Sequence, residues 1–354
     1  MFRIGVFTAS ILGMMLISAC TASPSLSQPT KPTLTPLEAT YTPGEMTPLS
    51  ASHGMQPIGD NNVPLASQTI GGQPLSYRLE NGVKVFELTA QMVRWPILDG
   101  VLVTAMTYNG TIPGPMIKVT EGDRVKVVFT NQLEEPTTIH WHGVEVPNAM
   151  DGVPDITQAP ILPGETFIYE FVAKPAGTFI YHSHYESDRQ VSAGLYGPFI
   201  IEPRAPQRPE PDVDVTLMLS EWLVRDGVTY PAMPMSGMEP NYFTINGKAY
   251  PATETLHVKV GQTVRLRLIG IGQFIHPMHL HGFPFKVMAI DGHPVPEAAQ
   301  QTMDTLSVAP GQRFDIEFTP TEPGQWMFHC HILHHTTNDN VDPGGLMMII
   351  DVAP

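Results

Sequence analysis

Short runs of alternating apolar and polar residues dominate the chain from Tyr77 onward. Residues 84–89 (KVFELT), 124–129 (RVKVVF) and 167–172 (FIYEFV) are rich in β-branched and aromatic side chains, and Asn-Gly and Pro-Gly turn signals separate such runs. No long stretch repeats its apolar residues with the period of a helix. The pattern predicts an all-β fold built from sandwiches of short strands.

Two copies of one sequence pattern fill this part of the chain. Gly122-Asp-Arg-Val-Lys-Val precedes His140 by the same number of residues as Gly261-Gln-Thr-Val-Arg-Leu precedes His279. Such an internal repeat predicts two homologous β-sandwich domains in succession. The resulting division is a flexible tether rich in Pro, Ser and Thr over residues 20–74, a first domain over 75–205 and a second over 210–354.

The first twenty residues have the pattern of a bacterial lipoprotein signal. Arg3 precedes an apolar run over residues 4–17 that is short for a transmembrane helix, and LISAC ends at Cys20. We expect residues 1–19 to be removed and lipid on Cys20 to anchor the protein to a membrane outside the cytoplasm, in the periplasm or at the cell surface. An ordinary secretory signal is the alternative.

Composition narrows the range of functions. The net charge is -15 and the sequence has no basic patch, so we expect no binding of nucleic acid. The two cysteines, Cys20 and Cys330, both have other expected roles, so no disulfide is predicted. Most of the 14 histidines gather in tight groups between His140 and His335. This grouping is the strongest chemical signal in the chain.

Each predicted domain contributes two His-X-His pairs. Residues i and i+2 of a strand point the same way, so each pair presents two imidazoles on one face. Eight imidazoles in register across a repeat indicate a metal site, although imidazole suits copper, zinc, iron and nickel alike. The pairs are His140 and His142, His182 and His184, His279 and His281, and His329 and His331.

The second domain carries an additional set of ligand-type residues. Cys330 lies between His329 and His331, and the same domain has His276 and His335. Two imidazoles with one thiolate are the donor set of electron-transfer copper sites, so His276, Cys330 and His335 select copper. The covalent bonds of Cys330 to its neighbours give an electron a short route to the eight-histidine group. The aligned residues of the first domain are Thr137, Ser183 and Asp188.

The motifs HWHG, HSH, HPMHLHG and HCHILHH stand in an order that resembles the multicopper oxidase family, which includes laccases, ascorbate oxidase, bilirubin oxidase and cuprous oxidases. The resemblance covers residues 75–354. It implies cupredoxin-like domains and four copper ions, namely a mononuclear type 1 copper and a cluster of one type 2 and two type 3 coppers. Electrons taken one at a time at type 1 would reduce O2 to water at the cluster.

The resemblance also implies a role for each ligand residue. An axial residue near the type 1 copper is expected after a longer loop than usual, and the choice between Leu346 and Met347 stays open. Asp151 is expected to deliver protons to oxygen, with a plain Asp-Gly turn as the alternative. The implied ligands are His276, Cys330 and His335 for type 1, His140 and His279 for type 2, and His142, His182, His184, His281, His329 and His331 for type 3.

The two-domain organisation resembles laccases that assemble as trimers, with each cluster built between domain 1 of one subunit and domain 2 of the next. We therefore expect a homotrimer. Rival hypotheses are a copper nitrite reductase, which keeps its type 1 site in the first domain, and a non-enzymatic copper-binding or electron-transfer protein. Eight convergent histidines exceed what electron transfer alone needs.

The reducing substrate is less well defined by the sequence. Oxidation of phenols or aromatic amines is the first hypothesis, and oxidation of Cu(I) is the second. Soft thioether ligands for Cu(I) are present in a proline-broken loop, although adaptable packing explains them as well. The residues concerned are Met233, Met235 and Met238 in that loop, Asp339 and Asp342 as candidate docking acids for a cationic substrate, and His257, His293 and His334, to which we assign no metal.

Overall fold

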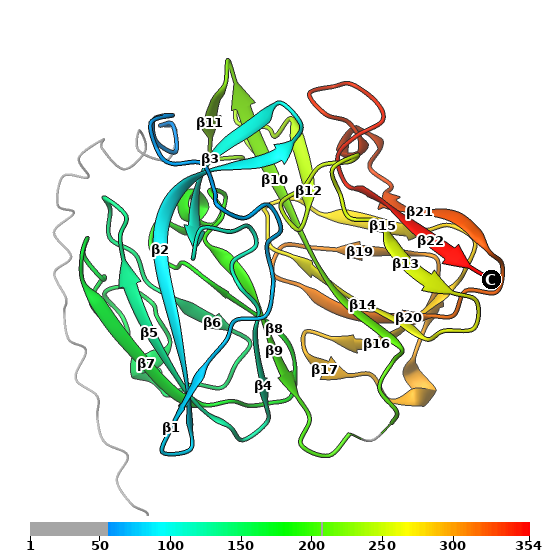
Figure 1. Ribbon diagram of the computed structural model, residues 1–354, viewed down its shortest axis with the longest axis horizontal. Helices are drawn as coiled ribbons and strands as arrows, with labels where there is room; N and C mark the ends of the chain where they lie inside the picture. Colours follow the sequence, from blue (N-terminus) through cyan, green and yellow to red (C-terminus); the bar gives the residue numbers. More distant parts are fainter. Residues whose placement is uncertain (1–55, 207) are drawn as a thin grey trace, which may run out of the picture. The chain divides into compact units, whose positions relative to one another are not determined.

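The computed structural model describes residues 56–206 and 208–354 of the chain (Figure 1). Regular structure in these residues is almost entirely β-strand, which confirms the predicted all-β class. The predicted signal segment, Cys20 and the tether as far as residue 55 lie outside the described residues. The removal of the signal, the lipid on Cys20 and the flexibility of that part of the tether therefore stay predictions. Within the described ranges, no helix has the length and apolar character that crossing a membrane requires.

Two packed sheets make up the first domain. Trp141 and Phe199 of one sheet and Phe86 and Val127 of the other are fully buried in the core between them. One sheet has the order β1 (Arg78–Glu80), β2 (Val83–Leu98), β5 (Arg124–Asn131) and β7 (Thr166–Val172), with β3 (Val101–Tyr108) paired to β2. The other has the order β4 (Ile117–Thr120), β9 (Tyr196–Glu202), β8 (Gly177–His182) and β6 (His140–His142).

The second domain repeats this plan with a larger first sheet. That sheet has the order β11 (Val228–Tyr230), β10 (Val213–Arg225), β14 (Val264–Gly270), β20 (Arg313–Phe318), β16 (Phe285–Ile290) and β17 (His293–Pro294), with β12 (Tyr242–Ile245) on β10 and β18 (Thr302–Met303) on β16. The other sheet has the order β13 (Leu256–Lys259), β22 (Met347–Ala353), β21 (Gly324–Cys330), β15 (His276–Leu280) and β19 (Thr305–Val308). The short helices of the two domains are η1 (Asn148–Met150), α2 (Ser187–Gln190), η2 (Glu297–Ala299) and η3 (Leu333–Thr336).

The folded part of the chain begins earlier than the composition predicted. Ile58 is buried, and its backbone N–H donates a hydrogen bond to the carbonyl of Thr229. Ala66 is buried as well, and its N–H donates to the carbonyl of Arg94. Residues 56–74, which we predicted to belong to the flexible tether, are therefore packed on both domains. Isolated apolar residues and backbone hydrogen bonds to strands hold this segment despite its polar composition.

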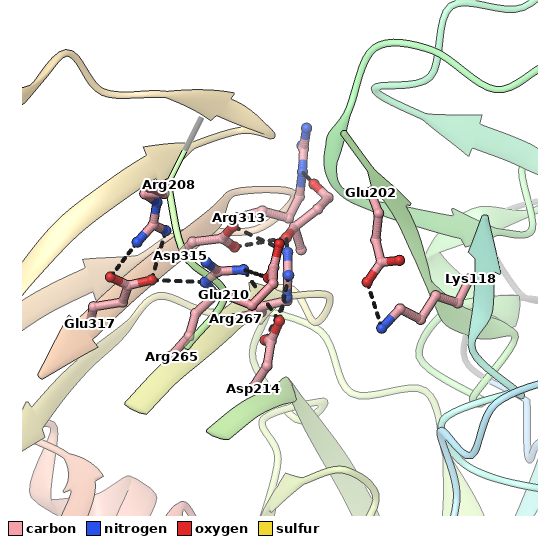
Figure 2. A network of polar contacts seen from close by, with 11 residues as sticks. Lys118, Glu202, Arg208, Glu210, Asp214, Arg265, Arg267, Arg313, Asp315 and Glu317 are labelled. Atoms are coloured by element: carbon pink, nitrogen blue, oxygen red, sulfur yellow. Dashed lines mark hydrogen bonds and ion pairs between the residues drawn. The ribbon is translucent and has the colours of Figure 1, made fainter. Parts of the chain in front are cut away.

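A charged network on the strands of the second domain (Figure 2) contacts the first domain where β8 faces β20. The Arg267 side chain donates hydrogen bonds to both carboxylate oxygens of Asp214 at 2.8 and 2.6 Å. It also donates to the hydroxyl of Thr178 in the first domain at 2.7 Å, and that hydroxyl donates to Asp315 at 2.7 Å. Arg267, Asp315 and Thr178 are buried, so one guanidinium connects acids of the second domain to a strand of the first.

The substitution Arg267→Met is expected to lower the free energy of unfolding by about 3–5 kcal/mol, because it leaves the buried carboxylate of Asp315 without its cation. Arg208→Met is the matched control, since the Arg208 side chain is 42% exposed where it pairs with Glu317. We expect that control to lose no more than about 1 kcal/mol. Urea unfolding of the three proteins measures the difference. Equal losses in the two variants would contradict a special role for Arg267.

Candidate metal centre

Strand alternation sorts the histidines of the second domain onto two faces. On β15, His276 and Met278 point into the core, whereas His279 points outward. On β21, Cys330 is fully buried between His329 and the exposed His331. The register pairs Met278 with Cys330 across the two strands. The sheet therefore separates an inner group of ligand-type residues from an outer one.

The inner group is the His2Cys set, formed by His276, Cys330 and His335. The Sγ of Cys330 lies 4.0 Å from Nδ1 of His276 and 3.6 Å from Nδ1 of His335, and the two Nδ1 atoms are 3.1 Å apart. All three residues are buried. Two imidazole nitrogens and one sulfur that face a common point fit copper, as predicted from the residue types.

The loop after β21 brings His335 back to this point. Gly345 presses against it with φ +59°, and a Cβ there would lie 2.1 Å from the carbonyl oxygen of His335, so only glycine fits. The N–H of Leu346 donates to that same carbonyl, and the N–H of Cys330 donates to the carbonyl of Leu346. Two members of the His2Cys set are therefore fixed to one another through the backbone of Leu346.

Strand register distinguishes the two candidate axial residues. Met347 is paired directly with His329, so both side chains lie on the outer face of the sheet. Leu346 is one residue earlier, shares the inner face with Cys330, and is fully buried in the same apolar cluster. This arrangement favours Leu346 and places Met347 on the other face from the thiol. An apolar neighbour adds no donor atom to the His2Cys set.

Burial keeps Cys330 and His335 in their uncharged forms. It raises the pKa of the Cys330 thiol to about 12 and lowers the pKa of His335 to about 3. A neutral imidazole is ready to bind a cation, and the thiol must lose its proton when one enters. Cation binding and proton release are therefore coupled at Cys330.

The first domain fills the equivalent place with neutral hydrogen-bonding groups. The hydroxyls of Thr137 and Ser183 donate to Oε1 of Gln190 at 2.8 and 2.5 Å. All three residues are buried, whereas Asp188, which we had aligned with His335, is exposed. Gln190 therefore corrects that alignment, because the single turn of α2 directs Gln190 inward instead of Asp188. This triad contains neither a thiol nor an imidazole.

The outer histidines form two sets of four. In the first set, His140 lies 5.3–5.8 Å from the other three rings, measured between centroids. In the second set, His279 lies 5.0–5.7 Å from the other three. The first four-histidine set is His140 and His142 on β6, His182 at the end of β8 and His184 just after it. The second is His279 on β15 with His281 just after that strand, and His329 on β21 with His331 just after that strand.

Backbone carbonyls orient four of these rings in the same way. Nδ1 of His140 lies 2.8 Å from the carbonyl oxygen of Asp151, and Nδ1 of His279 lies 2.9 Å from that of Asp304. The rings of His182 and His329 make the same contact with the carbonyl of the following residue. Because a carbonyl only accepts hydrogen bonds, Nδ1 carries the proton and Nε2 keeps a lone pair for a metal.

Both outer sets have an aspartate beside them. The carboxylate of Asp151 lies 3.4 Å from Nδ1 of His140, and that of Asp304 lies 3.8 Å from Nδ1 of His279. Gly152 follows Asp151 with φ +81°, and a Cβ there would lie 1.8 Å from the carbonyl oxygen of Ile139. The close approach of Gly152 to the backbone of Ile139 thus requires glycine in this Asp-Gly turn. The same turn places the carboxylate of Asp151 beside His140. Sequence reasoning missed Asp304, which reaches His279 only through pairing of β19 with β15.

The chain does not bring its two four-histidine sets together. In the part of the chain that the structure describes, every ring contact of these eight histidines stays within one domain. His142 of the first set instead lies against the turn between β19 and β20 of the second domain, where Gly311 is so close that a Cβ would lie 3.2 Å from Cε1 of His142. Burial, together with nearby Arg313, lowers the pKa of His142 to about 4. Each set is therefore half of the eight-histidine group that we predicted.

The remaining candidate residues belong to none of these sets. Met233 and Met238 are buried in a small apolar cluster, whereas Met235 is exposed. Nδ1 of His257 contacts Asp351, and Nε2 of His334 contacts Asn340. Asp339, Asp342 and His293 are exposed. Sequence reasoning missed Glu221, which lies beside the His2Cys set without belonging to it. Its carboxylate lies 2.6 Å from Nε2 of His276.

Comparison with known proteins agrees with this geometry. Family models described as multicopper oxidase match residues 89–206 and 228–343. The structure of the blue copper oxidase from Nitrosomonas europaea is 38% identical, with a TM-score of 0.71 over 76% of this chain and 85% of that one.

Two curated relatives are considerably longer than this chain. Laccase-1 of Cryptococcus neoformans var. grubii is 31% identical over 303 residues, which are 74% of this chain and 47% of the relative. Copper resistance protein A of Pseudomonas syringae pv. tomato is 30% identical over 274 residues, 64% of this chain and 44% of the relative. The chain spans less than half the length of these two proteins. The two sandwich domains, the order of the histidine pairs and these matches together show that the chain belongs to the multicopper oxidase family.

Proposed function

We propose that this protein is a laccase-like oxidase that takes electrons one at a time from phenols or aromatic amines and passes them to O2, which is reduced to water. The observation that carries the proposal is the position of Cys330, which belongs to the inner His2Cys set and is bonded to His329 and His331 of the outer set. An electron carrier needs only the inner set. Bound copper would supply the one-electron redox chemistry.

Each residue has a separate task in this proposal. The His2Cys set would hold the type 1 copper beside the apolar Leu346, and that copper would supply the site of electron entry. His140 and His279 would hold the type 2 copper, with Nε2 left free to bind it. The remaining outer histidines hold the type 3 pair, and they are His142, His182, His184, His281, His329 and His331. Asp151 and Asp304 stand beside the type 2 ligands, where partly exposed carboxylates can pass protons from water to the reduced oxygen.

The separation of the two four-histidine sets leads us to propose that one copy completes the site of another. The first set of one subunit would meet the second set of its neighbour, which is a head-to-tail contact between different surfaces. Such contacts close into a ring when the rotation allows it. A homotrimer in which each interface holds one cluster is the assembly that we propose.

The surroundings of the His2Cys set favour an aromatic reductant over Cu(I). Phe243 stacks on the ring of His335 at a centroid distance of 4.1 Å, and Phe274 approaches the same ring edge-on at 6.3 Å. The thioethers that would bind Cu(I) are not presented together, because Met235 is exposed but Met233 and Met238 are buried. An apolar, aromatic entry at His335 suits a phenol.

Oxygen uptake by the copper-loaded protein tests the substrate class. We expect uptake with 2,6-dimethoxyphenol, and we expect Met235→Leu to keep the wild-type rate with this phenol. Uptake that is much faster with a Cu(I) complex and that falls in Met235→Leu would instead identify a cuprous oxidase. A protein that is fully loaded with copper yet consumes no oxygen with either reductant would be a copper carrier, and the proposed function would be wrong.

A further inference from the structure

We propose that Glu221 is a positioning residue that fixes the ring of His276 and lowers the reduction potential of copper held by the His2Cys set. Glu221 lies on β10, in the sheet opposite the one that carries His276 and Cys330. It is only 3% exposed. The inference rests on the proposed copper site at His276, and it does not depend on which reductant the protein uses.

Both carboxylate oxygens of Glu221 are engaged. Oε1 lies 2.6 Å from Nε2 of His276, and Oε2 accepts a hydrogen bond from the backbone N–H of Gln273 at 3.1 Å. Within the described ranges, His276 is the only basic side chain at ion-pair distance from Glu221. Burial of a carboxylate without a Lys or Arg partner is costly. A cation held on the far side of the imidazole would offset that cost.

The loop before β15 is shaped around this carboxylate. A Cβ at Gly272 would lie 1.7 Å from Oε2 of Glu221, so any other residue at this position would displace the carboxylate. The side chain of Gln273 donates hydrogen bonds to the carbonyl of Asp188 and the hydroxyl of Ser192, which fixes the loop to the first domain. The carboxylate is therefore held on two sides, and its contact with His276 has little freedom to change.

The contact determines which nitrogen of His276 faces the metal position. A carboxylate accepts hydrogen bonds and does not donate them, so Nε2 of His276 carries the proton. Nδ1, which faces Cys330 and His335, then keeps its lone pair. A negative charge behind the ring also makes the imidazole a stronger donor, which favours the more highly charged, oxidised metal. Glu221 also covers the Nε2 edge of His276, so the substrate approaches the set from His335.

Three variants and one control separate these effects in the copper-loaded protein. Glu221→Gln keeps the size and one acceptor oxygen but removes the charge, so we expect a higher reduction potential with copper retention close to wild type. Glu221→Ala removes the contact, and Gly272→Ala displaces it while keeping the charge. Both are expected to bind copper about 10–100-fold more weakly and to shift the blue absorption band. Asp188→Asn removes an exposed charge nearby and is expected to leave both readouts unchanged.

Redox titration of the blue band and copper content after dialysis are the measurements. The inference is overturned if Glu221→Gln leaves the potential unchanged, or if Glu221→Ala retains the wild-type band and copper content. Circular dichroism of the copper-free variants shows whether they are folded. If Glu221→Ala and Gly272→Ala do not fold, the reduction potential of Glu221→Gln decides the outcome. Absence of a blue band in the copper-loaded wild-type protein would refute the proposed copper site itself, which is a different result from an unchanged potential.

Discussion

Cys330→Ser is expected to abolish the intense blue absorption of the copper-loaded protein and to lower its oxidase rate by more than about 100-fold. Loss of a residue that only supports a metal ligand lowers activity about 10–100-fold, and Cys330 is itself a proposed ligand. Serine keeps the shape of the side chain, but its hydroxyl is a hard donor and does not replace a soft thiolate at copper. The loss also removes the bonded route from the His2Cys set to His329 and His331. Visible spectroscopy and oxygen uptake measure the two effects.

The first domain offers a matched control for this experiment. Ser183 occupies the position that aligns with Cys330, and it also lies between two histidines. We expect Ser183→Ala to keep the blue band and most of the oxidase rate, because Thr137 still donates to Gln190 and no ligand of the His2Cys set changes. A Cys330→Ser protein that retained its blue colour and its rate would show that electrons enter elsewhere.

Loss of one histidine from either four-histidine set is expected to abolish oxygen reduction, yet two such inactive chains are expected to restore it when they assemble together. His182→Ala disables the first set, and His281→Ala disables the second. In an oligomer with clusters between copies, an interface is active when its first set comes from a His281→Ala chain and its second set comes from a His182→Ala chain, because each chain then contributes its unaltered domain. In a closed trimer that contains both chains, one of the three interfaces, about a third, is then active.

Co-expression of two differently tagged chains, followed by purification on both tags, provides the mixed oligomers. Oxygen uptake of this material is compared with that of each variant alone. The control pairs His182→Ala with His184→Ala, because both changes lie in the first domain and no interface regains an intact first set. Failure of the mixed His182→Ala and His281→Ala oligomers to recover activity would mean that each cluster is built within one chain.

Local patterns were sufficient to predict the strands and the histidine pairs. The alternation in His140-Trp141-His142 follows directly from strand geometry, since the burial of Trp141 forces both histidines outward. The repeat likewise predicted that Cys330 and His276 belong together, and β21 does pair with β15. The matching family models confirm the resemblance on which the expected copper roles were based.

Features that depend on contacts between distant segments were not predictable from the sequence. Glu221 reaches His276 across the sandwich, and no motif links the two residues. The choice of Leu346 over Met347 needed the register of β22 on β21. The inward direction of Gln190, which corrected the alignment of Asp188, depends on the single turn of α2. Ile58 packs in the core of the first domain, and its backbone N–H reaches the carbonyl of Thr229, far along the chain.

The number of electrons taken from the phenol for each dioxygen consumed tests the central claim most directly. If the four-histidine sets of neighbouring copies build a cluster that accepts four electrons, four one-electron oxidations occur for each dioxygen. No hydrogen peroxide then accumulates, and catalase leaves the oxygen trace unchanged. Two one-electron oxidations for each dioxygen, with hydrogen peroxide as the product, would contradict the account, because the histidine sets would then not act as one four-electron site.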